Sequence, residues 1–201
     1  PLLLESIIQK RNKKIIISDA TLRDGNHAIR HQINTKQIEV YCKAAEKAGI
    51  DIIEVGHGNG VGASSIQVGL SNLTDTKMLE ISRKFLKNTK LGVHIIPGFA
   101  TIQDIKVAIN VGVDVFRVAS HCTEADITQK HIEFVRKNNR KVFGVLMMSH
   151  MASKEVLLQE AKKMKEYGAQ GIVLMDSAGA YVPENVKERV SFLKKKLKNI
   201  P

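Results

Sequence analysis

Residues 15–27 have the sequence Ile-Ile-Ile-Ser-Asp-Ala-Thr-Leu-Arg-Asp-Gly-Asn-His, an apolar strand that runs directly into charged and polar side chains. A carboxylate such as Asp24 suits a hard divalent cation, and the Arg23 guanidinium can hold a developing oxyanion. Histidine, here His27, is the side chain that titrates near neutral pH. The stretch therefore holds the parts for metal-assisted acid–base chemistry. A charged turn after a buried strand is the alternative, and the spacing leaves both open.

Short apolar segments alternate with helical patterns along the whole chain. The apolar segments are rich in β-branched residues or almost continuously apolar, which is typical of parallel strands covered on both faces. We expect strands at Lys14–Asp19, Asp51–Val55, Lys90–Ile95, Asp114–Ser120, Val142–Ser149 and Gly171–Ser177.

The segments between the strands have helical periodicity, and several carry helix-end signals. Ser153 is a predicted N-cap, Pro183 suits a first turn, and glycines 49, 112 and 168 stand where helices should end. The expected helices are Thr35–Ala48, Asp75–Lys87, Ile102–Asn110, Ala125–Asn138, Ser153–Tyr167 and Pro183–Leu197.

This alternation predicts right-handed βαβ crossovers and a mainly parallel sheet. Periodicity alone cannot separate an open doubly wound sheet from part of an eight-unit barrel. Polar residues cluster just beyond the strand ends, and in a barrel those ends form one rim around a shared site. A complete barrel needs roughly 250 residues. We therefore expect residues 1–201 to form one α/β domain, an incomplete TIM (β/α)8-type barrel of about six βα units.

The net charge of +11 comes mostly from lysines scattered along the predicted helices, with a dense patch at Lys194–Lys196 and Lys198. Aromatic interleaving and nucleic-acid motifs are lacking, so we expect a solvated helix face and no nucleic-acid partner. Polyanion binding by the patch remains an alternative. A basic surface would also attract small anionic substrates.

Cysteines and apolar runs bound the class of protein. Cys42 and Cys122 are far apart in sequence, which argues against a disulfide framework or a zinc knuckle and fits a reducing compartment. The first apolar run, Pro1–Glu5, is too short for a signal peptide or a membrane span. We expect a cytoplasmic protein without a membrane partner.

The motif Asp19–Gly25 resembles the signature of the metal-dependent pyruvate aldolase and carboligase superfamily, which includes 3-hydroxy-3-methylglutaryl-CoA lyase and 2-isopropylmalate synthase. The extension Asn26–Gln32 resembles the form found in the class II 4-hydroxy-2-oxovalerate aldolases. Further segments similar to that family follow in the family's order, at Ile53–Gly58, Ser120–Asp126, Leu146–Met151 and Met175–Ala180.

The resemblance implies a TIM barrel that splits 4-hydroxy-2-oxopentanoate, or a close homologue, into pyruvate and a short aldehyde. Carried over position by position, Asp24 would ligate the metal and Arg23 would hold the substrate and stabilise the enolate. His27 would be the catalytic base, and Ser177 would contact the substrate. Retro-aldol cleavage fits these roles, because a base must take the proton of the C4 hydroxyl and a Lewis acid must stabilise the enolate.

The same resemblance implies a divalent metal, with Mn²⁺ expected and Mg²⁺ or Co²⁺ as alternatives. It also implies a small 2-oxoacid substrate, an acylating aldehyde dehydrogenase as partner, and an oligomer at full length.

The chain departs from the family where the remaining metal ligands are expected. The family uses a His-x-His pair on the strand that follows the sixth, and a later tyrosine as the catalytic acid. This chain has no His-x-His. We therefore expect the N-terminal three-quarters of a barrel. Two alternatives stay open: another carbon–carbon lyase or synthase of the superfamily, or a non-catalytic barrel fragment that acts as a binding or assembly module.

Three more histidines stand at predicted strand ends, His57, His121 and His150. They either shape the pocket through hydrogen bonds or act as substitute metal ligands or proton relays. Asp176 either supports a metal ligand or caps the following turn.

Overall fold

The structure, a computed structural model, describes residues 15–198. Its sheet has six parallel strands that lie side by side in chain order. They are β1 (Ser18–Asp19), β2 (Ile52–Glu54), β3 (Lys90–Ile95), β4 (Val115–His121), β5 (Lys141–Met147) and β6 (Ile172–Leu174).

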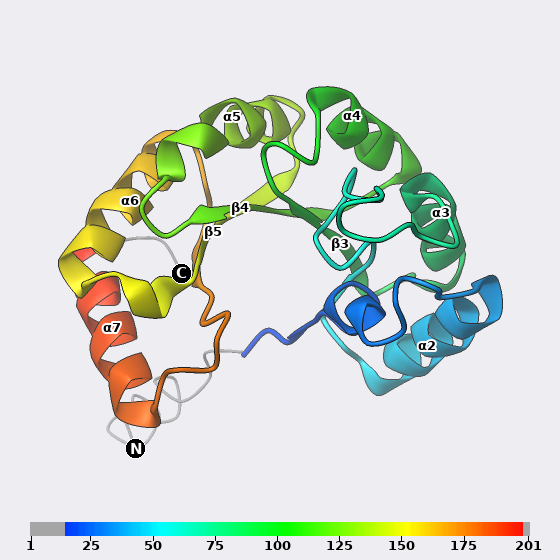
Figure 1. The fold of residues 1–201 in the computed structure, drawn as a ribbon, viewed down its shortest axis with the longest axis horizontal. Helices are drawn as coiled ribbons and strands as arrows, with labels where there is room; N and C mark the ends of the chain where they lie inside the picture. The colour runs from blue at the N-terminus through cyan, green and yellow to red at the C-terminus, as the bar shows by residue number, and fades with distance from the viewer. Residues whose placement is uncertain (1–14, 199–201) are drawn as a thin grey trace, which may run out of the picture.

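The helices cover the outer side of this sheet. Figure 1 shows them as an arc around the strands that is open between α2 and α7. The α-helices are α2 (Thr35–Ala48), α3 (Asp75–Phe85), α4 (Ile102–Val111), α5 (Gln129–Lys137), α6 (Lys154–Glu166) and α7 (Pro183–Lys196). Three short 3₁₀ helices are η1 (Asp24–His27), η2 (Ala125–Thr128) and η3 (Ser149–Met151).

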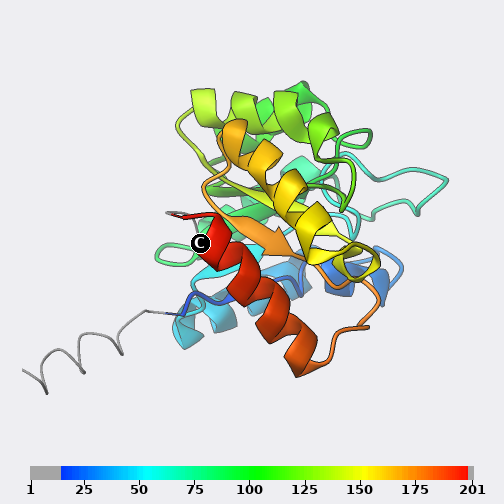
Figure 2. The ribbon, with the colours of Figure 1, turned by 90° about the vertical axis from the view of Figure 1, so that its left-hand side faces the viewer.

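This arrangement confirms the predicted fold class, an incomplete TIM barrel with six βα units. Because all the strands are parallel, their carboxyl ends lie at one end of the sheet. Figure 2 shows the loops that follow the strands gathered at that end, with the loop between β2 and α3 projecting furthest. Residues that follow different strands are therefore brought to one rim.

The core lies between the helices and the outer face of the sheet and is mostly aliphatic. Its largest fully buried side chains include Ile38, Ile53, Met78, Leu91, Phe116 and Leu157. Full burial of one such side chain contributes about 1.5–3 kcal/mol, so this layer holds the sheet and thereby the rim in place.

The predicted helix ends are confirmed where local chemistry sets them. Gly49 and Gly112 end α2 and α4 in the left-handed conformation, with φ of 73° and 97°. The Ser153 side chain accepts a hydrogen bond from the Val156 amide, and α7 begins at Pro183. Gly168 follows the C-cap of α6 with φ of 108°.

The first strand is shorter than predicted. β1 contains only Ser18 and Asp19, although Ile17 still accepts a hydrogen bond from the Ile52 amide at 3.1 Å. Lys14 lies outside the described residues. Residues 15–17 were expected to be buried on both faces, and they are more than half exposed because β1 pairs with β2 alone among residues 15–198.

Two other boundaries differ from the prediction by more than two residues. The helix predicted from Ala125 begins as η2, because Glu160 accepts the Ala125 amide and the Thr128 hydroxyl donates to the Ala125 carbonyl. β6 ends at Leu174 because the Met175 carbonyl and the Ser177 hydroxyl instead accept hydrogen bonds from residues 148 and 149.

Both cysteines are free, as the sequence predicted, and both are buried. Within residues 15–198, no helix has the length and apolar character needed to cross a membrane.

Candidate active site

Arg23 is the centre of the candidate site. The amides of Arg23 and Asp24 both donate to the Ala20 carbonyl, so the chain turns sharply after β1. The Arg23 side chain is buried, and its Nε donates to Glu54 Oε2 at 3.1 Å. Its Nη1 donates to Asp24 Oδ1 and to the Gly58 carbonyl, both at 3.0 Å. These bonds fix the orientation of the guanidinium.

Asp24 and His27 lie on η1, directly beside Arg23. The Asp24 side chain is 67% exposed, so its carboxylate is accessible to a ligand. The His27 ring lies against Gly58, where an added Cβ would be 2.3 Å from His27 Nε2. Since Arg23 also contacts Gly58, the structure brings the three strand-end residues of the prediction together.

Two buried histidines, His31 and His57, lie beside His27. The rings of His31 and His57 stack with centroids 3.6 Å apart, and the His27 ring lies edge-on to His31 at 4.9 Å. His57 Nδ1 accepts the Asn59 amide at 3.1 Å, which leaves the proton on Nε2, 3.1 Å from the Gly69 carbonyl. Burial lowers the pKa of both His31 and His57, which favours neutral rings. With both nitrogens bonded to backbone, the His57 ring is held in place and is not positioned to bind a metal.

Glu54 and Arg117 are functional candidates that the sequence interpretation missed. Glu54 on β2 is fully buried and accepts hydrogen bonds from Arg23, from the Ser18 hydroxyl at 3.2 Å, and from Arg117 on β4. The signal in the sequence was a charged residue in each of two mostly apolar strands, because a buried charge must be paired.

The residues beside this charged group are also buried. His94 on β3 has its pKa lowered to about 3, first by burial and then by the charge of Arg23. Asn26 donates to the Gly56 carbonyl at 3.2 Å, while its buried Oδ1 has no hydrogen-bond partner among residues 15–198.

Ser177 lies on the same rim, after β6, where its hydroxyl oxygen accepts the Met148 amide at 3.1 Å. It makes no hydrogen bond with the Arg23 group within residues 15–198. Asp176 accepts the Tyr181 amide at 2.7 Å and also lies 3.1 Å from His150 Nδ1. Asp176 thus caps the turn, and its other oxygen lies beside a rim histidine. The third rim histidine, His121, bonds the Thr123 hydroxyl.

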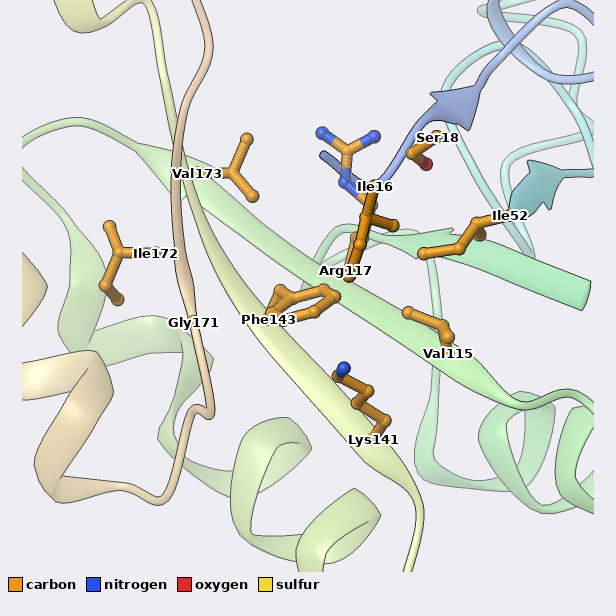
Figure 3. Close-up of a pocket in the computed structure, with 10 residues that line it drawn as sticks. All are labelled: Ile16, Ser18, Ile52, Val115, Arg117, Lys141, Phe143, Gly171, Ile172 and Val173. Atoms are coloured by element: carbon orange, nitrogen blue, oxygen red, sulfur yellow. The ribbon is translucent and has the colours of Figure 1, made fainter. Parts of the chain in front are cut away.

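A cavity of about 350 Å³ lies inside the arc of strands. Figure 3 shows Arg117 reaching from β4 toward Ser18 on this inner side, with Phe143 beside it and Lys141 further along β5. None of the four site residues predicted from the sequence lines this cavity. Asp24 and His27 are instead exposed at the strand ends, where a small anion can reach them from solvent.

Asp24 is the right kind of ligand for a hard divalent cation. Within residues 15–198, no group of three or more histidine, cysteine, aspartate or glutamate side chains could hold a metal ion. The chain therefore fits such a cation through one exposed carboxylate, and the other ligands would be water, substrate or groups outside the described residues.

A profile of the HMGL-like family matches residues 14–201. The chain belongs to this family. It is 57% identical over 182 residues to a 4-hydroxy-2-oxovalerate aldolase of Pectobacterium atrosepticum and 56% identical over 184 residues to one of Spirochaeta aurantia. These matches cover 90% and 91% of this chain, but only 53% and 54% of the relatives. The chain thus spans about half the length of the curated relatives that it matches.

The relatives confirm the resemblance to 4-hydroxy-2-oxovalerate aldolases seen in the sequence. Among solved structures, the carboxyl transferase domain of Rhizobium etli pyruvate carboxylase matches this chain with a TM-score of 0.78. The match covers the whole of this chain and 38% of that structure's chain. At 15% identity, this likeness bears on the fold alone, and it agrees with the barrel described above.

Proposed function

We propose that this HMGL-like chain is part of a metal-dependent carbon–carbon lyase that cleaves 4-hydroxy-2-oxopentanoate, or a close homologue, to pyruvate and a short aldehyde. The main support is the convergence of Arg23, Asp24 and His27 on one strand end, in a chain whose relatives carry the name of that aldolase.

Arg23 would bind and orient the substrate. Its guanidinium is held by Glu54, Asp24 and Gly58, so it would bind the incoming 2-oxoacid without reorganisation. In the proposed reaction it hydrogen-bonds the oxygen that becomes the enolate oxygen of pyruvate. A fixed donor of this kind stabilises charge that develops in the transition state.

His27 would take the proton from the C4 hydroxyl, after which the bond between C3 and C4 breaks and the aldehyde leaves. Its position against Gly58 and His31 fixes the ring close to Arg23. Asp24 would hold the divalent metal, and the bound metal would act as a Lewis acid toward the 2-oxoacid. Ser177, which follows β6 at the other edge of the sheet, would also contact the substrate.

The proposal includes the wider expectations from the resemblance. The metal is Mn²⁺, with Mg²⁺ or Co²⁺ as alternatives, and the chain forms the first six units of a single barrel domain. An acylating aldehyde dehydrogenase receives the product, the full-length protein is an oligomer, and it acts in the cytoplasm.

The test is pyruvate release from 4-hydroxy-2-oxopentanoate by the full-length protein, measured with a coupled lactate dehydrogenase. We expect turnover that requires Mn²⁺ and that falls at least 10²-fold in His27→Ala, the lower range of the contribution of a general base. His131→Ala is the matched control, because His131 contacts the Ala100 carbonyl and lies away from the Arg23 group. Unchanged turnover in His27→Ala would exclude His27 as the base.

A further inference from the structure

Arg23 has one guanidinium nitrogen left for a ligand. An arginine carries five N–H donors, one on Nε and two on each Nη. Nε is bonded to Glu54, and Nη1 is bonded to Asp24 and to the Gly58 carbonyl. Nη2 donates no hydrogen bond within residues 15–198. This nitrogen is the one available for an oxygen of the substrate.

The pairing of Arg23 with Glu54 is incomplete. Nε and Nη2 form one edge of a guanidinium, and a carboxylate prefers to bind that edge with both oxygens. Here only Oε2 of Glu54 is bonded to Arg23, at 3.1 Å. The carboxylate is fully buried, so water does not compete for its other oxygen.

Arg117 accounts for the missing second bond. Its Nη1 donates to Glu54 Oε1, the oxygen that would otherwise turn toward Nη2 of Arg23. The Ser18 hydroxyl donates to the same oxygen at 3.2 Å. Burial and the charge of Arg23 lower the pKa of Arg117 to about 10, so it remains a cation at neutral pH.

We propose that Arg117 is a positioning residue: by occupying Glu54 Oε1, it limits Arg23 to a single bond with Glu54 and keeps Nη2 of Arg23 free for the 2-oxoacid. Arg117 itself lies on β4 and lines the inner cavity, so it acts through Glu54 and does not touch the substrate. The inference rests on the proposed function, because it assigns the free nitrogen to that substrate.

The charges are consistent with this role. Asp24, Arg23, Glu54 and Arg117 form a chain of alternating charge from the exposed rim to the inner side of the sheet. Without Arg117, the buried Glu54 would have Arg23 as its one cationic partner. Arg23 would then be drawn fully into the pair and away from the rim.

The test uses the full-length protein with Arg117→Met and Arg117→Lys. Arg117→Met should raise both KM and the dissociation constant of oxalate, a planar dianion that resembles the pyruvate enolate, by about ten-fold or more, the value of one charge-assisted hydrogen bond. Arg117→Lys keeps a cationic donor for Oε1 and should recover most of this loss. Wild-type KM and oxalate affinity in Arg117→Met, or no recovery in Arg117→Lys, would overturn the proposal.

Arg83→Met is the matched control. Arg83 also forms a partly buried ion pair, with Asp114 at 2.8 Å, but Asp114 directly precedes the amino end of β4 and the pair makes no contact with Glu54 or Arg23 among residues 15–198. Its loss should lower the melting temperature and leave KM and oxalate affinity unchanged. If Arg83→Met raised KM as much as Arg117→Met, general destabilisation would explain both, and the positioning role would be wrong.

A crystal structure of Arg117→Met separates this inference from the proposed reaction. We expect both Nε and Nη2 of Arg23 within hydrogen-bond distance of Glu54. That result supports the role of Arg117 even if the protein cleaves no 4-hydroxy-2-oxoacid, whereas a single bond as in the wild type would overturn it.

Discussion

Gly58 is contacted by two side chains of the candidate site, Arg23 and His27. Its carbonyl accepts Arg23 Nη1, and its Cα lies so close to His27 that a Cβ would be 2.3–2.5 Å from three ring atoms. Only a residue without a side chain leaves the imidazole in place. The constraint on position 58 is therefore one of space. The obstructing atoms belong to the end of the flexible His27 side chain, so this ring can move.

Gly58→Ala should therefore separate activity from stability. The His27 ring can swing away, so we expect a change of less than about 1 kcal/mol in the free energy of unfolding. The displaced ring should lower kcat about 10²-fold, as a displacement of about 1 Å can. Steady-state kinetics and urea denaturation measure the two effects.

Gly144→Ala is the control for this substitution. A Cβ at Gly144 would meet Met164 Sδ at 2.4 Å, and Met164 is buried in the core. Overpacking of this kind costs typically about 1–3 kcal/mol, while kcat should hold. If the two variants behaved alike, Gly58 would have no specific relation to His27.

At this scale the sequence predicted the contiguous residues and missed their distant partners. Arg23, Asp24 and His27 share one strand end, so their proximity follows from the chain itself. Glu54 lies 31 residues from Arg23, and Arg117 lies 63 residues from Glu54. Their pairing depends on which strands become neighbours in the folded sheet, and a charged residue in an apolar strand shows only that some partner exists.

At the scale of elements, α7 lacks the side-chain N-cap that α6 has. The N-cap residue of α6 is Ser153, whose hydroxyl accepts the Val156 amide at 3.2 Å. The N-cap residue of α7 is Val182, which is 52% exposed, has an extended backbone, and provides no side-chain acceptor.

Val182→Ser should therefore stabilise the protein. The serine hydroxyl can accept the Asn185 amide, which adds about 1 kcal/mol, the usual value of an N-cap. The measurement is the melting temperature. Ser153→Ala, which removes the corresponding bond from α6, should shift it down by a similar amount. No rise in Val182→Ser would mean that the first turn of α7 is already satisfied.

Helix ends were predictable because caps are local, whereas strand lengths were not. Ser153, Pro183 and Gly112 act within their own turns and stood where the sequence placed them. The length of β1 depends on having a neighbour on each side, and residues 15–17 pair on one side only within the described chain.

At the scale of the whole molecule, burial of neutral histidines links stability to pH. His31, His57 and His94 lie beneath the candidate site, each less than 6% exposed. Burial lowers the pKa of all three, that of His94 to about 3. Backbone hydrogen bonds from residues 87–89 lower the pKa of Glu46 to about 2. Glu46 therefore also contributes stability that is lost as the pH falls.

His94→Gln tests this linkage. A histidine whose pKa is lower in the folded protein binds protons more tightly when unfolded, so its contribution is complete above pH 6.5 and is lost as the pH falls toward 3. His94 alone should lower the free energy of unfolding by about 2 kcal/mol between pH 7 and pH 5, at roughly 1.4 kcal/mol per pH unit below 6.5.

Urea denaturation at each pH gives the free energy of unfolding, and the difference between wild type and His94→Gln removes the general effect of the basic net charge. We expect that difference to shrink by about 2 kcal/mol over this range. A difference that stays constant would mean that His94 binds its proton equally well in both states, and burial beside Arg23 would then not govern its titration.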